Sequence, residues 1–205
     1  MHKTMKTMLY CLACLLLTAA CHTDKQQQPT AQNEQTTVDK NAASIFDLAS
    51  TWKTEEGNTI HLRDLKGKTL VVVMIYTSCK SACPRLVADM LGISEKVPDR
   101  AKNNVQYVLV SIDPEHDTPE KLKEFAISKS MDGKEWTFLQ GNPETVREFA
   151  NVLAVKYKEI SPMDFSHSNI ISVFDPAGRL VHQQEGLGVN NQATVDAIIK
   201  TAGNE

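Results

Sequence analysis

The sequence predicts an α/β fold, in which helices cover a buried sheet. Two continuous apolar runs rich in β-branched residues, 69–76 and 105–112, have the length and composition of strands buried on both faces. Apolar residues at helical spacing follow the first run, from 82 to 96. After the second run, the Asp-Thr-Pro segment 117–119 supplies a cap and an early proline, which predicts a helix to about 129. Because alternating strands and helices are typical of α/β sheets, we expect one domain of this class.

The other elements are shorter. Alternation of apolar and polar residues predicts half-buried strands near the start of the domain, at 44–48, 52–54 and 59–62, with a turn at 55–58. The elements predicted beyond residue 130 are a strand at 136–139, a helix at 143–153, strands at 169–175 and 179–183 around the turn signal Pro176-Ala177-Gly178, and a helix at 191–202. The segment 163–168, before the first of these last two strands, is expected to be a loop.

Composition narrows the class of protein. The chain has 205 residues, 41% hydrophobic and 23% charged, which suits one globular domain with a core of ordinary size. The formal net charge is -3, and the Lys and Arg residues form no stripe or tail. We therefore expect no nucleic acid partner.

Residues 1–20 are predicted to be a signal peptide of the lipoprotein type. Lys3 and Lys6 precede an apolar stretch of roughly 13 residues that ends in small residues. This stretch is too short to span a bilayer stably, which takes about 20 residues. The segment 17–21, Leu-Thr-Ala-Ala-Cys, resembles a bacterial lipobox, although Thr18 stands where Leu is usual. We expect Cys21 to be the lipidated first residue of the mature protein.

Residues 21–43 are predicted to be a disordered tether, because they carry almost no apolar side chains that could be buried. The domain 44–205 would then be anchored by lipid to a membrane, on the periplasmic side of the cell envelope. Thiols are oxidised in that compartment unless something reduces them. A protein that uses thiols there needs an envelope thiol reductant as a partner.

Cys79 and Cys83 are the only cysteines beyond residue 21, and they directly follow the first buried run. A strand that leads through cysteines into a helix is the thioredoxin arrangement, in which the helix N-terminus favours thiolate. Four positions apart on a helical turn, the two Cβ atoms would be about 5–6 Å apart, whereas a disulfide prefers about 3.8 Å. The spacing therefore favours a soft metal ion, copper or zinc, over disulfide exchange. Two inert core cysteines are the alternative.

A copper site with two sulfurs needs a third ligand, usually imidazole. His116 follows the second core strand, and His167 lies in the expected loop 163–168, at the same end of a thioredoxin-like sheet as the cysteines. His61 and His182 fall within strand patterns and are expected to be surface or edge residues. The position of His167 favours it as the third ligand.

Taken together, these motifs resemble the Sco/SenC family of copper proteins involved in cytochrome c oxidase assembly. The matching segments are Leu62-x-Asp64-Leu65-Lys66-Gly67-Lys68, Tyr76-Thr77, Cys79-x-x-x-Cys83-Pro84, Ser111-Ile112-Asp113-Pro114, Asp117-Thr118-Pro119, His167-Ser168 and Asp175-Pro176-x-Gly178. The resemblance covers residues 44–205. It implies a thioredoxin-like fold with an N-terminal β-hairpin and family insertions.

The resemblance also implies a site and a role. Cys79, Cys83 and His167 would bind one copper ion, as Cu(I) in a trigonal site and as Cu(II) with an added ligand. Asp113 matches an acidic residue near the family's site, where it would orient the loop or act as an accessory ligand. The implied role is a chaperone that delivers copper to cytochrome c oxidase subunit II or to another envelope cupro-protein.

Two positions depart from the family pattern. Residues 80–82 are Lys-Ser-Ala where Pro-Asp-Val is frequent, and Ser166 replaces a frequent acidic residue before the histidine. Neither change removes a ligand. Lys80 is expected to lower the pKa of the neighbouring thiols.

Three alternatives stay open. Cys79 and Cys83 could be the redox-active pair of a thiol–disulfide oxidoreductase that acts on the cysteines of a cupro-protein, although such enzymes normally use Cys-x-x-Cys. A peroxiredoxin is disfavoured, because Tyr76 stands where that family has Thr. A structural zinc site would need a fourth ligand, for which Asp113 and His116 are the candidates. The sequence favours a metal-binding chaperone over an enzyme.

Overall fold

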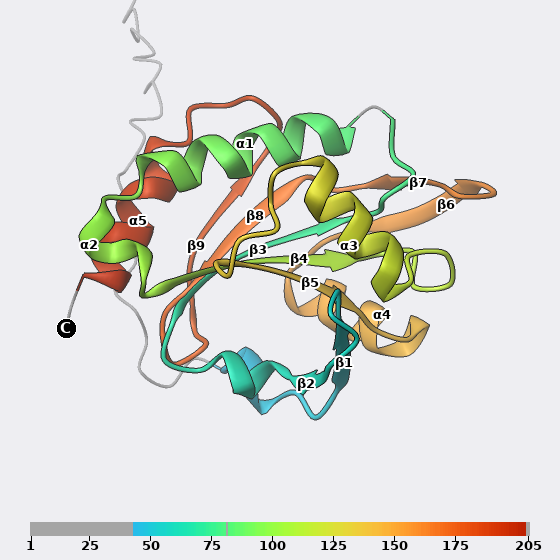
Figure 1. Cartoon of the computed structure of the whole chain (residues 1–205), viewed down its shortest axis with the longest axis horizontal. Helices are drawn as coiled ribbons and strands as arrows, with labels where there is room; N and C mark the ends of the chain where they lie inside the picture. Colours follow the sequence, from blue (N-terminus) through green and yellow to red (C-terminus); the bar gives the residue numbers. More distant parts are fainter. Residues whose placement is uncertain (1–42, 81, 204–205) are drawn as a thin grey trace, which may run out of the picture. The chain divides into compact units, whose positions relative to one another are not determined.

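The computed structural model describes residues 43–80 and 82–203, which form a mixed α/β sheet covered by helices (Figure 1). The strands of its main sheet are β1 (Thr51–Thr54), β2 (Thr59–His61), β3 (Thr69–Ile75), β4 (Val105–Ser111), β5 (Trp136–Gln140), β8 (Ile170–Phe174) and β9 (Leu180–Glu185). Their order in the sheet is β2-β1-β5-β4-β3-β8-β9. Two further strands, β6 (Tyr157–Ser161) and β7 (Asp164–His167), pair only with each other, as a separate hairpin.

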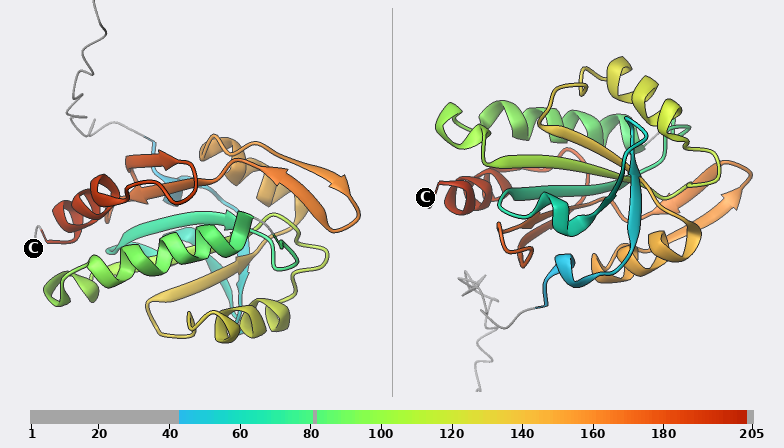
Figure 2. Two further views of the ribbon diagram at one scale, coloured as in Figure 1. Left: turned by 90° about the horizontal axis from the view of Figure 1, so that it is seen from above. Right: turned by 60° about the horizontal axis from the view of Figure 1, so that its bottom comes forward.

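The helices are α1 (Ala82–Lys96), α2 (Asp99–Lys102), α3 (Pro119–Ser128), α4 (Pro143–Val152) and α5 (Gln192–Ala202). Helices α1 and α3 cover one face of the main sheet, and α4 lies on the opposite face (Figure 2). Helix α5 packs against α1 and β3. Short 3-10 helices, η1 (Ile45–Asp47) and η2 (Leu62–Leu65), flank the N-terminal hairpin β1–β2.

Strands β3 and β4 form the centre of the core. They run parallel, from the pair Thr69–Val105 to the pair Ile75–Ser111, and every residue of both strands is buried. Strand β5 pairs in parallel with β4, and β8 is antiparallel to β3. The prediction of two strands buried on both faces is confirmed, because helices cover both faces of the sheet at this point.

Two predicted elements are wrong. Residues 44–48 begin with the 3-10 helix η1 instead of forming a strand, because Ser44 Oγ accepts a hydrogen bond from Phe46 N and the Asp47 carboxylate accepts one from Ser44 N. This is a capping box, which favours a helical turn over extended backbone. The expected loop 163–168 instead contains strand β7, paired with β6. The other predicted helices and strands agree with the structure to within about two residues at their ends.

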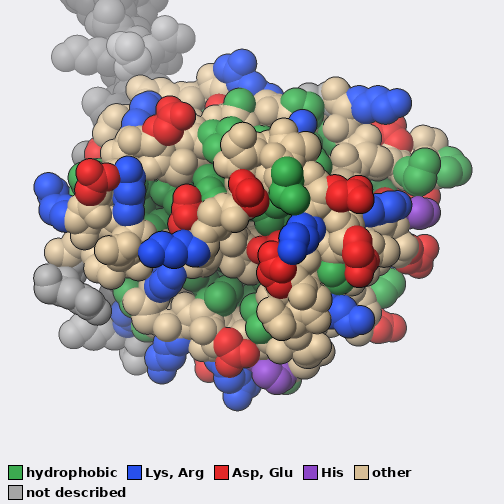
Figure 3. Space-filling model, in the orientation of Figure 1, with side chains coloured by type: hydrophobic (Ala, Val, Ile, Leu, Met, Phe, Trp, Pro, Cys, Tyr) green, Lys and Arg blue, Asp and Glu red, His purple; other side chains and the backbone are tan. Residues whose placement is uncertain are grey.

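Several predictions concern residues that the structure does not describe. The signal peptide 1–20, lipidation of Cys21 and the tether 21–43, apart from its last residue, lie outside the described residues. Within 43–80 and 82–203, no helix has the length and apolar character that crossing a membrane requires. On the face of the molecule shown in Figure 3, acidic and basic side chains are interspersed.

Candidate metal centre

Cys79 lies in the loop between β3 and α1. A turn closed by a hydrogen bond of 3.3 Å from Cys79 N to Tyr76 O reverses the chain after the strand. The Cys79 side chain is buried, and its Sγ accepts a hydrogen bond of 3.2 Å from the backbone N–H of Cys83. The sulfur therefore lies at the N-terminal end of α1, where unpaired N–H groups and the helix dipole stabilise negative charge.

Cys83 belongs to the first turn of α1 and is 1% exposed. Burial raises the pKa of its thiol strongly, and the neighbouring Cys79 adds to this increase. Desolvation of the sulfur outweighs any lowering of this pKa by Lys80, whose side chain is exposed. The two sulfurs are not joined by a disulfide bond. A metal ion would stabilise the Cys83 thiolate and displace its proton.

His167 is the last residue of β7 and is half-buried. Its Nδ1 lies 3.0 Å from the carbonyl oxygen of Ser168, so Nδ1 carries the proton and donates it to that oxygen. Its Nε2 then presents a lone pair, and this atom lies 3.9 Å from Cys83 Sγ. Burial lowers the pKa of the imidazole. A neutral imidazole with its tautomer fixed by a backbone carbonyl is the form that binds a metal.

The separation of Cys83 Sγ and His167 Nε2 fits a shared metal ion. A sulfur and a nitrogen bound at about 2.3 Å and 2.0 Å to one ion, with a trigonal angle, are about 3.7 Å apart. The observed separation is 3.9 Å. Two sulfurs and one imidazole are a soft donor set, of the kind that selects Cu(I) over hard cations.

The three side chains are neighbours, but they do not yet form a closed set of ligands. Among residues 43–80 and 82–203, no group of three or more His, Cys, Asp or Glu side chains is gathered closely enough to hold a metal ion. Cys83 is the central member, because the N–H of Cys83 meets the Cys79 sulfur and the Cys83 sulfur meets the His167 ring. Binding of one ion by all three side chains would therefore require them to move closer together.

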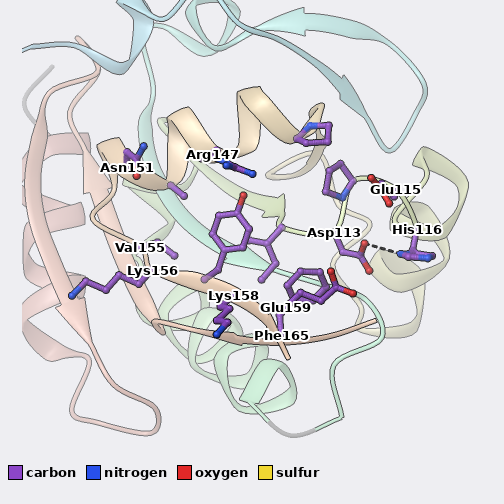
Figure 4. Close-up of a pocket in the computed structure, with 15 residues that line it drawn as sticks. Asp113, Glu115, His116, Arg147, Asn151, Val155, Lys156, Lys158, Glu159 and Phe165 are labelled. Atoms are coloured by element: carbon purple, nitrogen blue, oxygen red, sulfur yellow. Dashed lines mark hydrogen bonds and ion pairs between the residues drawn. The ribbon is translucent and has the colours of Figure 1, made fainter. Parts of the chain in front are cut away.

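The other two candidate ligands, Asp113 and His116, contact each other. Asp113 lies two residues beyond the end of β4 and is 4% exposed. Its Oδ1 lies 2.8 Å from His116 Nδ1, and its buried Oδ2 has no hydrogen-bond partner. The Asp113 carboxylate raises the pKa of His116. Both residues line a cleft of about 600 Å³ beside α4 and the β6–β7 hairpin, where they face each other (Figure 4). The structure therefore pairs His116 with Asp113, and His167 with Cys83.

The remaining two histidines of the domain lie in the strands predicted for them. His61 ends β2, with Nδ1 3.3 Å from the carbonyl oxygen of Ser50. His182 lies in β9, with Nε2 3.0 Å from Thr194 Oγ1. These contacts give both rings a structural role at the sheet edges.

Sequence reasoning missed the role of Asp117, which it treated as the start of a helix and as part of a segment that matches the family. Asp117 is 1% exposed, and its carboxylate accepts hydrogen bonds from Thr77 N, Thr77 Oγ1 and Ser111 Oγ. Burial raises its pKa. The carboxylate thus ties the end of β4 to the first residues of the cysteine loop. Nothing in the local sequence distinguishes it from an ordinary cap, because its partners lie up to 40 residues away.

The fold and this site together define a thioredoxin-like domain, with two sulfurs after its central strand β3 and one imidazole at the end of the β6–β7 hairpin. The chain belongs to the SCO1/SenC family, whose sequence model matches residues 34–202. The SCO1 protein homolog of Bacillus subtilis (strain 168) is 28% identical over 141 residues, which cover 67% of this chain and 72% of that protein.

Two solved structures share the fold. ScoI of Arabidopsis thaliana, solved with copper bound, superposes with a TM-score of 0.67 at 19% identity and covers 80% of this chain and 99% of its own. BsSco is described as a member of the Sco family of cytochrome c oxidase assembly proteins, with a disulfide switch. It has a TM-score of 0.67 at 23% identity, and the match covers 82% of this chain and 99% of BsSco. The predicted thioredoxin-like Sco fold is confirmed.

Proposed function

We propose that this chain is a copper chaperone that binds one copper ion through Cys79, Cys83 and His167. The observation that carries the proposal is the distance of 3.9 Å between Cys83 Sγ and His167 Nε2. The Cys79 sulfur is hydrogen-bonded to the backbone N–H of Cys83. Family membership supports it, and so does the copper in the structure of the relative from Arabidopsis thaliana. Bound copper would supply a soft, redox-active centre at this position.

The residues of the site have separate tasks. The Cys79 sulfur accepts a hydrogen bond from the Cys83 N–H at the N-terminal end of α1, a position that favours negative charge. Cys83 holds its proton in the metal-free protein, because burial raises the pKa of its thiol. His167 offers Nε2 without having to lose a proton, since its Nδ1 is fixed on the Ser168 carbonyl. Loading therefore releases the Cys83 proton, and acid favours release of the ion.

The proposed client is cytochrome c oxidase subunit II or another cupro-protein of the envelope. The description of BsSco as a member of a family of oxidase assembly proteins supports this choice. We further propose that the chain is held to a membrane on the periplasmic side through a lipid on Cys21. An envelope thiol reductant would keep Cys79 and Cys83 ready for copper.

The test is an anaerobic titration of the reduced full chain, in detergent, with Cu(I) and with Cu(II). We expect one equivalent of each to bind. His167→Ala should weaken Cu(II) binding by about 100-fold, as expected for the loss of the nitrogen ligand. His182→Ala is the matched control, because that half-buried ring is hydrogen-bonded in β9. Absence of copper binding, or equal effects of the two variants, would contradict the proposal.

A thiol–disulfide oxidoreductase is the second candidate. It is favoured by the placement of one sulfur at the start of a helix and of a second, buried sulfur one turn later. The reduced chain would then reduce a peptide disulfide, and Cys79→Ser would stop the reaction at its first step. Rapid exchange in a protein that binds no copper would make this the function.

A further inference from the structure

The hairpin that carries His167 is not part of the main sheet. Strands β6 and β7 pair only with each other, in a register from Tyr157–His167 to Ser161–Asp164 with an irregularity near the tip. Most of their residues are exposed, and Met163 at the tip has a left-handed backbone with φ of 61°. Figure 1 shows the hairpin extending away from the sheet. The position of His167 therefore depends on the contacts between this hairpin and the rest of the domain.

The Tyr76 side chain makes the first set of these contacts. Tyr76 follows β3 directly and is 2% exposed. Its hydroxyl donates to Asp164 Oδ1 at 2.9 Å, accepts from Phe165 N at 3.3 Å and lies 3.1 Å from the Phe165 carbonyl oxygen. Its ring meets the edges of the Phe165 and His167 rings, with centroids 5.2 Å and 5.9 Å apart.

The Ser78 hydroxyl makes a second contact, which is with the tip of the hairpin. Its Oγ donates to the carbonyl oxygen of Met163 at 3.0 Å. Ser78 immediately precedes Cys79, so this bond joins the cysteine loop to the hairpin. Together the two hydroxyl groups hold residues 163–165 against residues 76–78.

The geometry of β7 carries this constraint to the imidazole. Alternate residues of a strand lie on one face, so Phe165 and His167 point the same way. Both are half-buried, whereas Asp164 and Ser166 between them are exposed. A hairpin fixed at the backbone of Phe165 therefore presents the His167 ring to Tyr76 and to Cys83, as the contacts of that ring show.

We propose that the Tyr76 hydroxyl, assisted by the Ser78 hydroxyl, is the positioning group that sets His167 against the two cysteines. The inference rests on the proposed metal site and adds a residue that acts through His167. Without these bonds the hairpin moves more freely, and the imidazole meets the sulfurs for a smaller fraction of the time. Two thiolates still satisfy Cu(I), whereas Cu(II) prefers nitrogen ligands. Loss of the bonds should therefore weaken Cu(II) binding more than Cu(I) binding.

The first test is hydrogen exchange on the metal-free full chain, comparing Tyr76→Phe with Tyr107→Phe. Both changes remove one hydroxyl from a buried tyrosine, but Tyr107 stacks on Trp136 in the main sheet. We expect the amides of residues 164–167 to exchange about fivefold faster in Tyr76→Phe, as loss of one net hydrogen bond implies, and to be unchanged in Tyr107→Phe. Equal exchange in the two variants overturns the proposal.

The second test measures copper in the same variants. Tyr76→Phe should bind Cu(II) about fivefold more weakly and shift the visible absorption of the Cu(II) form toward that of His167→Ala, with Cu(I) affinity kept within about twofold. A Cu(II) spectrum and affinity like those of the unmodified chain would overturn the role of Tyr76. Parallel losses of Cu(I) and Cu(II) would also overturn it, because they would indicate damage to the cysteines.

The Tyr76 side chain also interacts with Cys79, so Tyr76→Phe could act through the cysteine and not through the hairpin. Ser78→Ala separates these two explanations. Ser128→Ala is its matched control, because Ser128 Oγ donates to the Phe125 carbonyl oxygen at 2.8 Å at the end of α3. Ser78→Ala should reproduce the effects of Tyr76→Phe at smaller size, and Ser128→Ala should have none. A hairpin unaffected by Ser78→Ala would limit the positioning role to Tyr76 and contradict the paired arrangement.

The outcomes separate this inference from the proposed function. If His167→Ala leaves copper binding and its spectrum unchanged, the metal site itself is wrong. If His167→Ala changes them and Tyr76→Phe does not, only the positioning role is wrong. Hydrogen exchange tests, without any metal, whether the two hydroxyl groups hold the hairpin in place.

Discussion

The two sulfurs and the imidazole are supported by very different parts of the molecule. The cysteines follow β3, a strand in which every residue is buried between neighbours on both sides. His167 ends a hairpin whose residues are mostly exposed and which pairs with no strand of the main sheet. A packed sheet allows little movement, whereas a hairpin held by a few polar contacts opens at small cost. The site thus combines two cysteines that follow a packed strand with a histidine on a hairpin held by a few polar contacts.

This contrast would suit the proposed chaperone, which must take up an ion and then give it away. A fully rigid set of three ligands would bind tightly but would release slowly. In the proposed site, the sulfurs would keep the ion while the imidazole leaves. Two exposed apolar residues, Ile160 and Met163, lie toward the tip of this hairpin, and Figure 3 shows hydrophobic side chains at this end of the molecule.

The largest expected effect tests the rigidity of the sheet. Leu109→Ala in β4 removes a side chain that is 0% exposed and should lower the free energy of unfolding by about 2–5 kcal/mol. Ile160→Ala in β6 is the matched change, and since that side chain is 61% exposed it should cost less than about 0.5 kcal/mol. Urea unfolding of both variants measures the difference. Similar losses would mean that the hairpin is as firmly packed as the sheet.

The next effect concerns the carboxylate that ties the cysteine loop to β4. Asp117→Asn should destabilise the fold by about 1–3 kcal/mol, because buried donors on Thr77 and Ser111 lose a charged acceptor. It should also weaken Cu(I) binding, since the loop that carries Cys79 loosens. Asp175→Asn is the control: Asp175 is also buried and accepts from Ala177 N and Arg179 N, in the turn after β8. A comparable loss of Cu(I) affinity in the control would deny Asp117 a special link to the site.

The smallest effect is a dependence of stability on pH. The pKa of the Cys83 thiol is raised above its ordinary value of about 9, so the folded state holds this proton more tightly than the unfolded chain does. The resulting stability is fully present below pH 9 and is lost as the pH rises above it, by at most about 1.4 kcal/mol per unit. Thermal unfolding of the metal-free chain between pH 8 and 9, below the range in which Tyr76 and Tyr107 ionise in the unfolded chain, measures the slope, and Cys83→Ala should remove most of it. A slope that persists in Cys83→Ala would assign the loss to another group.

Most of the main sheet could be predicted from the sequence because its signals are local. The β-branched runs of β3 and β4 and the caps at Thr118 and Asn142 act within a few residues of the elements they specify. The error at residues 44–48 was also local: the alternation suggested a strand, but Ser44 and Asp47 form a capping box that the same segment contains. In that case the polar side chains, which bond the backbone, outweighed the apolar pattern.

The hairpin β6–β7 could not be predicted in this way. Residues 157–161 are mostly exposed and carry no alternation of buried and exposed positions, so they show no strand period. The strand forms because Tyr157 meets His167, ten residues later, and because β7 is fastened to the cysteine loop. His167 was identified as a candidate only through its position before β8 and the family resemblance.

Local patterns and motifs in the sequence were enough to predict the α/β class, the dithiol at the junction of β3 and α1, and the three candidate ligands Cys79, Cys83 and His167. Only the tertiary structure brought His167 to within 3.9 Å of Cys83, across 84 residues of chain, and aimed its Nε2 at the sulfur. The contacts of Asp117 with the cysteine loop and of Tyr76 with the hairpin are also visible only in the tertiary structure. The physical reason is that these contacts join segments far apart in the chain, and their energy is gained only once the sheet has folded and placed those segments side by side.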